Sequence, residues 1–150
     1  APGQLVIAGH VEAVEASLPL MKQAGAKRAL TLPVSAPFHC ALMKPAAERL
    51  HEKLDMIEVQ IPSVPVIQNV SMKPESDVVV IRELLSKQTC SPVRWTQTVQ
   101  NFETLGIQAA AEFGPGAVLS GLAKRIQTGA QHLPLGTCEL FTRALQEING

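Results

Sequence analysis

Short apolar runs alternate with longer segments of helical periodicity from one end of the chain to the other. The run Gln4–Gly9 is apolar, β-branched and closed by glycine, so it predicts a buried strand. Residues 10–26 then repeat apolar side chains at helical spacing, with Pro19 predicted to kink the helix and Gly25 to end it. Lys27–Ser35 predicts a second strand, which completes a β-α-β unit.

The rest of the chain continues this alternation. We predict strands over residues 64–71 and from residue 107 into the Gly-Pro-Gly turn at 114–116. Helices are predicted over residues 41–57, 76–88, 91–106, 117–127 and 136–149, with Gly150 past the last one. Pro45 suits the first turn of one helix, and Ser76 is a possible cap of the next. This order favours an α/β fold with a mainly parallel sheet.

Composition narrows the classes of function. Hydrophobic residues make up 46% of the 150 residues and charged residues 17%, which suits a folded domain. The net charge is zero and aromatic residues are only 3%, which argues against nucleic-acid binding. No apolar run is long enough to cross a membrane. Three widely spaced cysteines without a CxxC pair indicate reduced thiols in a cytoplasmic protein.

The stretch PVSAPFHC places His39 between an aromatic ring and a thiol, at a strand-to-helix corner. A single histidine in such a place is more often structural than functional. Three features favour a functional role. Functional sites cluster at the ends of strands in α/β folds, a helix begins directly after His39, and Pro33 and Pro37 stiffen the chain that leads to it. An imidazole at this corner can take and return a proton near neutral pH.

Other candidate sites are weaker. The chain has no G-x-S-x-G nucleophile elbow, and GHVEA at residues 9–13 lacks its serine. A dyad of Cys40 with the adjacent His39 is improbable because neighbouring side chains diverge at a corner. The Gly-Pro-Gly turn could cradle an anion, although a plain tight turn is the simpler interpretation. The four histidines show no metal-ligand spacing, so we predict no metal.

Four stretches, in this order and spacing, resemble the C-terminal half of the malonyl-CoA:acyl carrier protein transacylases. They are PVSAPFHCALMKPAAERL, VPVIQNVS, SKQTCSPVRWTQTVQ and EFGPGAVLSGLAKRI. The resemblance covers nearly all of the chain and weakens only beyond Gly129. The Pro-Val-x-Trp element at residues 92–95, the Gly-Pro-Gly turn and the His39 corner are together specific.

The resemblance implies a Ser-His mechanism. A serine in an elbow attacks the malonyl thioester of malonyl-CoA, and the acyl-serine is resolved by the phosphopantetheine thiol of acyl carrier protein. The catalytic histidine of the family falls on His39, and the residue whose backbone carbonyl orients it falls on Gln88. No cofactor is implied, since malonyl-CoA is a substrate, and we expect a monomer.

The resemblance also implies a layout. Residues 1–43 correspond to the trailing part of a small ferredoxin-like subdomain, and residues 44–150 to part of a hydrolase-like α/β core. The chain lacks an initiator Met, and it contains neither the elbow serine, the malonate-binding arginine nor the first oxyanion-hole loop of the family. We expect these to lie upstream of Ala1, and the chain alone to be inactive.

Two further roles follow from the resemblance. Phe38, directly before His39, accompanies malonyl selection in such enzymes by excluding an α-methyl group; the plainer interpretation is a packed ring. Acyl carrier proteins are acidic, so the basic residues become docking candidates. They are Lys27, Arg28, Lys44, Lys124 and Arg125. The alternative to an acyltransferase half is a non-catalytic α/β fragment that serves carrier-protein docking or assembly.

Overall fold

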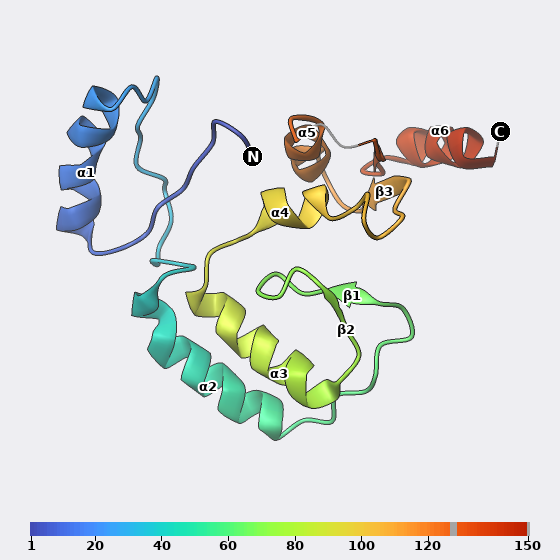
Figure 1. Cartoon of the computed structure of the whole chain (residues 1–150), viewed down its shortest axis with the longest axis horizontal. Coiled ribbons are helices and arrows are strands. Elements are labelled where there is room, and N and C mark those ends of the chain that lie inside the picture. Colours follow the sequence, from blue (N-terminus) through green and yellow to red (C-terminus); the bar gives the residue numbers. More distant parts are fainter. Residues whose placement is uncertain (127–128, 150) are drawn as a thin grey trace. The chain divides into compact units, whose positions relative to one another are not determined.

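A computed structural model describes residues 1–126 and 129–149, and it divides the chain into two compact units (Figure 1). One unit is Val6–Val93, and the other combines Ala1–Leu5 with Arg94–Gly150. The elements are α1 (Val11–Gln23), η1 (Ala41–Met43), α2 (Lys44–Asp55), β1 (Val66–Ile67), β2 (Pro74–Glu75), α3 (Val78–Lys87), η2 (Gln88–Cys90), α4 (Trp95–Gln100), β3 (Ala109–Glu112), α5 (Val118–Lys124), β4 (Gln131–Pro134) and α6 (Cys138–Asn149).

In the first unit, α2 and α3 lie side by side and carry its core (Figure 1). Ala47 and Leu54 of α2 and Ile81 of α3 are buried. Pro45 lies in the first turn of α2, where its missing N–H leaves no helical hydrogen bond unmade, as predicted. The 3-10 turns η1 and η2 pack against one another beside these helices. This pair of helices is the support on which the His39 corner rests.

In the second unit, β3 and β4 pair in parallel, from Ala109 opposite Gln131 to Glu112 opposite Pro134. The connection between them includes α5, and α6 follows β4, so helices and a parallel strand pair alternate. Val99 is fully buried here, and Phe102 and Leu133 are nearly so. The predicted α/β class is confirmed. The sequence analysis missed β4, which is short and ends in proline.

The two predicted strands at residues 4–9 and 27–35 are wrong in this structure. Both segments are extended but pair with no strand among the described residues, and Leu5 and Leu30 are 90% and 66% exposed. A strand is stabilised by its ladder of hydrogen bonds and by one buried face, and neither is present here. The predicted strand at 64–71 reduces to β1, which forms a two-residue antiparallel hairpin ladder with β2.

One helix interior and one helix cap differ from prediction. α1 runs unbroken through Pro19, and the left-handed Gly25, with φ of 95°, follows its end as predicted. α3 is capped by Asp77 and not by Ser76, because the Asp77 carboxylate accepts the N–H groups of Val79 and Val80. Gln127, the last residue of one predicted helix, and Gly150, predicted to follow another, lie outside the described residues.

None of the described helices is long and apolar enough to cross a bilayer. The predicted boundary between residues 43 and 44 falls inside the unit Val6–Val93, at the junction of η1 and α2. It stays a prediction about the intact fold.

Candidate functional site

His39 lies at a tight corner between an extended segment and η1. Its φ is 63°, the left-handed conformation that a residue with a Cβ adopts at a cost of about 1–3 kcal/mol. Such residues persist where the surroundings hold them, and they gather at functional sites. The corner is braced from within, since the N–H of Phe38 donates to the Ala36 carbonyl and the Cys40 thiol to that of Pro37.

Two consecutive carbonyls of η2 hold His39 from the other side. The ring Nδ1 lies 3.1 Å from the carbonyl oxygen of Gln88, and the backbone N–H of His39 donates to the Thr89 carbonyl at 3.1 Å. We call these two acceptors the η2 carbonyl pair. The sequence analysis placed Gln88 beside His39 through the family resemblance, and the structure brings the two together; it did not anticipate the second bond.

The Gln88 contact selects one form of the ring. A carbonyl oxygen can only accept, so the bond requires the proton on Nδ1. In the neutral ring this leaves the lone pair on Nε2, where a general base needs it. His39 is exposed, so solvent reaches the ring in this structure. Held in this tautomer, His39 can accept a proton from a hydroxyl brought to Nε2.

Phe38 and Cys40 flank this histidine. The Phe38 ring is 49% exposed in this chain. The Cys40 thiol is turned to the Pro37 carbonyl at 3.2 Å, a contact that gives it a local partner. The selectivity role of Phe38 stays a prediction.

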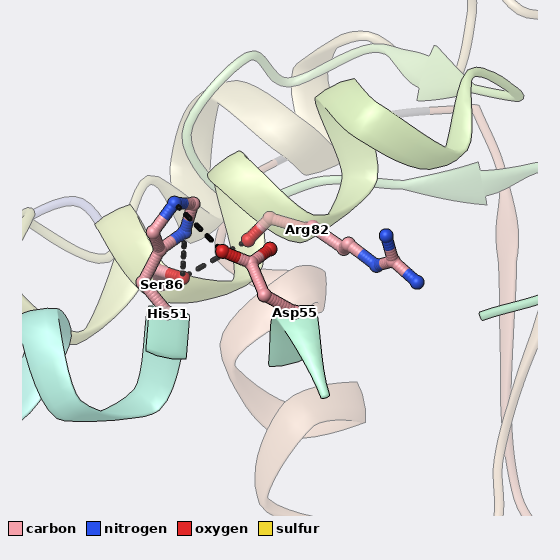
Figure 2. Close-up of polar contacts among 4 residues, drawn as sticks. All are labelled: His51, Asp55, Arg82 and Ser86. Atoms are coloured by element: carbon pink, nitrogen blue, oxygen red, sulfur yellow. Dashed lines mark hydrogen bonds and ion pairs between the residues drawn. The ribbon is translucent and has the colours of Figure 1, made fainter. Parts of the chain in front are cut away.

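A Ser-His-Asp grouping, separate from the His39 corner, joins α2 to α3, and sequence analysis did not find it (Figure 2). His51 Nδ1 lies 3.3 Å from Ser86 Oγ, and its Nε2 lies 3.7 Å from Asp55 Oδ2. Ser86 is buried, and its hydroxyl donates to the Arg82 carbonyl at 3.0 Å. A hydroxyl that is buried and already donating is a poor nucleophile, so the grouping fastens two helices together.

The backbone N–H groups that follow the Gly-Pro-Gly turn already bind a carboxylate of this chain, that of Glu112. The Glu112 carboxylate accepts the N–H of Leu119 at 2.9 Å and that of Ser120 at 2.7 Å, at the start of α5. The Ser120 hydroxyl and these backbone groups hold the pKa of Glu112 below its ordinary value of 4.5. The turn is therefore structural, and Gly136 packs so closely on Gly114 that a Cβ would meet its carbonyl at 2.7 Å.

The basic docking candidates are all exposed. Lys27, Arg28 and Lys44 belong to the unit Val6–Val93, and Lys124 and Arg125 to the other unit. Arg125 also donates to Gln4 Oε1 at 3.5 Å, a long contact that leaves most of the guanidinium free to bind. Their docking role stays a prediction.

His132 lies on β4, and the sequence offered it only as one of four histidines without metal-ligand spacing. It borders a hollow of about 510 Å³ beside Lys124 and Arg143, and its ring lies 6.3 Å from that of Phe102. Burial, and secondly the charge of Lys124, lower the pKa of His132 below 6.5. Across residues 1–126 and 129–149, no cluster of His, Cys, Asp and Glu suits a metal ion.

The chain is 53% identical over 147 residues to a malonyl CoA-acyl carrier protein transacylase of Haemophilus influenzae, which covers 98% of this chain and 47% of the relative. A solved transacylase of this name from Coxiella burnetii is 43% identical, with a TM-score of 0.89 over 95% of this chain and 45% of its own. No protein-family model matches the chain.

A third similar structure is a malonyl-transacylase in complex with its type II PKS acyl-carrier protein. It is 45% identical, with a TM-score of 0.89 over 93% of this chain and 45% of that one. The chain thus spans about half the length of the relatives it matches. The predicted resemblance to the malonyl-CoA:acyl carrier protein transacylases is confirmed over nearly the whole chain.

Proposed function

We propose that this chain supplies the histidine part of a malonyl-CoA:acyl carrier protein transacylase, with His39 as the general base and acid. The observation that carries the proposal is the η2 carbonyl pair, which fixes both the backbone and the Nδ1–H tautomer of an exposed, left-handed histidine. A histidine that served packing alone would need neither a fixed backbone nor a fixed tautomer. The sequence similarity to transacylases supports the same conclusion.

In this mechanism Nε2 of His39 takes the proton of a serine hydroxyl as the oxygen attacks the malonyl thioester carbonyl. The tetrahedral intermediate collapses, and His39 returns the proton to the CoA thiolate as it leaves. In the second half-reaction Nε2 deprotonates the phosphopantetheine thiol of the carrier protein, which attacks the acyl-serine, and the serine oxygen recovers the proton.

Gln88 is the positioning residue of this site. Its carbonyl orients the ring as the aspartate does in a Ser-His-Asp triad, but it carries no negative charge. The imidazolium that forms in each half-reaction is therefore stabilised by a dipole and not by an ion pair. The contribution of Gln88 is therefore the orientation of the ring and not a charge.

We infer that the nucleophilic serine is provided outside these 150 residues. The sequence contains no G-x-S-x-G elbow, and the relatives are about twice as long as the part they share with this chain. The complex of a similar transacylase with its acyl-carrier protein supports such a carrier as the acceptor here. The 150-residue chain alone is then expected to transfer no malonyl group.

The test is malonyl transfer from malonyl-CoA to a holo acyl carrier protein by the full-length protein. We expect His39→Ala to lower kcat by about 10²–10⁴-fold, the usual contribution of a general base. The matched control is His10→Ala, an exposed histidine before α1. Transfer that survives His39→Ala at the wild-type rate would favour the non-catalytic alternative.

A further inference from the structure

We propose that Thr89, supported by Ser91, is a positioning residue for His39. The hydroxyls of these two residues donate hydrogen bonds to the last carbonyls of α3 and so fix the turn whose next two carbonyls hold His39. This inference rests on the proposed function of His39. It concerns η2, the turn that carries the Gln88 carbonyl.

The end of a helix leaves backbone carbonyls without helical partners. At the end of α3 two carbonyls accept hydroxyls from the following residues, and the Ser86 carbonyl also accepts a backbone N–H of the cap. Thr89 Oγ1 donates to the Ser86 carbonyl at 2.8 Å, and Ser91 Oγ donates to the Lys87 carbonyl at 2.7 Å. The next two carbonyls, those of Gln88 and Thr89, then turn to His39.

Thr89 acts at both ends of this arrangement. Its hydroxyl ties η2 to α3, and its own carbonyl accepts the backbone N–H of His39 at 3.1 Å. Any rotation of the Thr89 backbone would therefore move both members of the η2 carbonyl pair, which are adjacent along the chain. The half-buried hydroxyl limits that rotation.

The residue that receives the Thr89 hydroxyl is itself anchored. Ser86 is buried, and its side chain lies between the His51 ring of α2 and the Arg82 carbonyl (Figure 2). The Thr89 hydroxyl thus connects η2 to a packed pair of helices instead of to a free end. Ordered support of this kind is what keeps a catalytic side chain within the narrow range of productive geometry.

The Gln88 carbonyl also accepts the Ser91 N–H at 3.3 Å, so two donors converge on one oxygen. If the turn loosened, the Gln88 oxygen could satisfy itself with the local Ser91 donor and release the ring. His39 would then be free to adopt the other tautomer, with the proton on Nε2 and no lone pair for the serine.

The experiment compares Thr89→Val with Thr89→Ser in the full-length protein. Valine keeps the shape and removes the hydroxyl, and serine restores the donor. We expect Thr89→Val to lower kcat by about three- to tenfold, the effect of one hydrogen bond, with the KM for malonyl-CoA unchanged. Thr89→Ser should recover most of kcat. Ser91→Ala should act in the same direction and less strongly.

A matched control lies in α6, where Thr142 Oγ1 donates to the Cys138 carbonyl at 2.9 Å in the same manner. Thr142→Val removes an equivalent bond away from His39 and should leave kcat unchanged. The second readout is the ¹⁵N spectrum of the His39 ring. Wild type should show the Nδ1–H tautomer, and Thr89→Val should gain the Nε2–H form, a change that a merely structural bond would not cause.

The outcomes separate the two proposals. If wild type is active, His39→Ala is inactive and Thr89→Val keeps both kcat and the wild-type tautomer, the role of Thr89 is wrong and the proposed function stands. If His39→Ala is as active as wild type, the proposed function fails first. If Thr89→Val does not fold, the role of Thr89 is tested by Ser91→Ala and by the ¹⁵N spectrum of Thr89→Ser. An unchanged tautomer and rate in Ser91→Ala would overturn the inference.

Discussion

At the scale of single residues, Phe38 is the side chain next to His39 whose size can matter to the acyl group. It is 49% exposed and lies directly before the left-handed His39. We predict that Phe38→Ser raises the kcat/KM for methylmalonyl-CoA relative to malonyl-CoA by about tenfold or more, because room for one methyl group is worth about 1–3 kcal/mol. Competition between the two thioesters measures the ratio.

The control for this change is Phe141→Ser on α6, a ring of similar exposure at 45%. It should leave the ratio as in wild type. An unchanged ratio in Phe38→Ser as well would remove Phe38 from acyl selection and leave it as a packing side chain of the intact protein.

The residues of the candidate site were only partly predictable from sequence. His39 could be singled out from its corner between strand and helix, but its pairing with Gln88 came from the family resemblance, because 49 residues separate the two. The Thr89 hydroxyl gave no signal, since threonine is common near helix ends for many reasons. The His51–Ser86 contact depends on the register of α2 against α3, which spacing along one chain does not reveal.

At the scale of elements, the start of α5 depends on one carboxylate. The pKa of Glu112 is lowered in the folded state by the bonds from Ser120 and Leu119. Below the ordinary value of 4.5 the unfolded chain therefore binds more protons than the folded chain, so stability falls as the pH falls through that window. Above 4.5 the stabilising contribution is fully present.

We predict that Glu112→Gln lowers the free energy of unfolding at pH 7 and flattens its dependence on pH below 4.5. Urea unfolding of both proteins at several pH values measures this. The control is Glu139→Gln in the first turn of α6. Parallel pH curves for wild type and Glu112→Gln would show that the carboxylate does not hold α5.

Helices were easier to predict than strands for a physical reason. Helices such as α2 and α3 make their hydrogen bonds within their own segments, so a local amphipathic pattern is enough to predict them. The apolar runs Gln4–Gly9 and Lys27–Ser35 need neighbouring strands, and the described residues offer them none. β4 went unnoticed because it is four residues long, and only its pairing with β3 defines it.

At the scale of the whole molecule, the proposed function requires an acidic carrier protein to bind. We predict that reversing Lys124 and Arg125 to glutamate raises the KM for acyl carrier protein at low salt and leaves the KM for malonyl-CoA unchanged. Charge attraction acts mainly on the rate of association and weakens as salt screens it. The difference from wild type should therefore shrink as salt is added.

The matched control reverses Arg49 and Lys53, two exposed basic residues of α2 outside the predicted docking set. It changes the net charge by the same amount. If both double variants raised the carrier KM equally, net charge and not a local docking surface would be responsible, and the assignment of Lys124 and Arg125 would be withdrawn.

The central claim is that His39, oriented by Gln88, activates a serine for acylation. The most direct measurement is a rapid-mixing time course of malonyl-CoA with the full-length protein, in the absence of carrier, read by intact mass. We expect wild type to gain one malonyl group and His39→Ala to gain it at least about 10²-fold more slowly. Acylation of His39→Ala at the wild-type rate, or of a residue other than serine, would contradict the account.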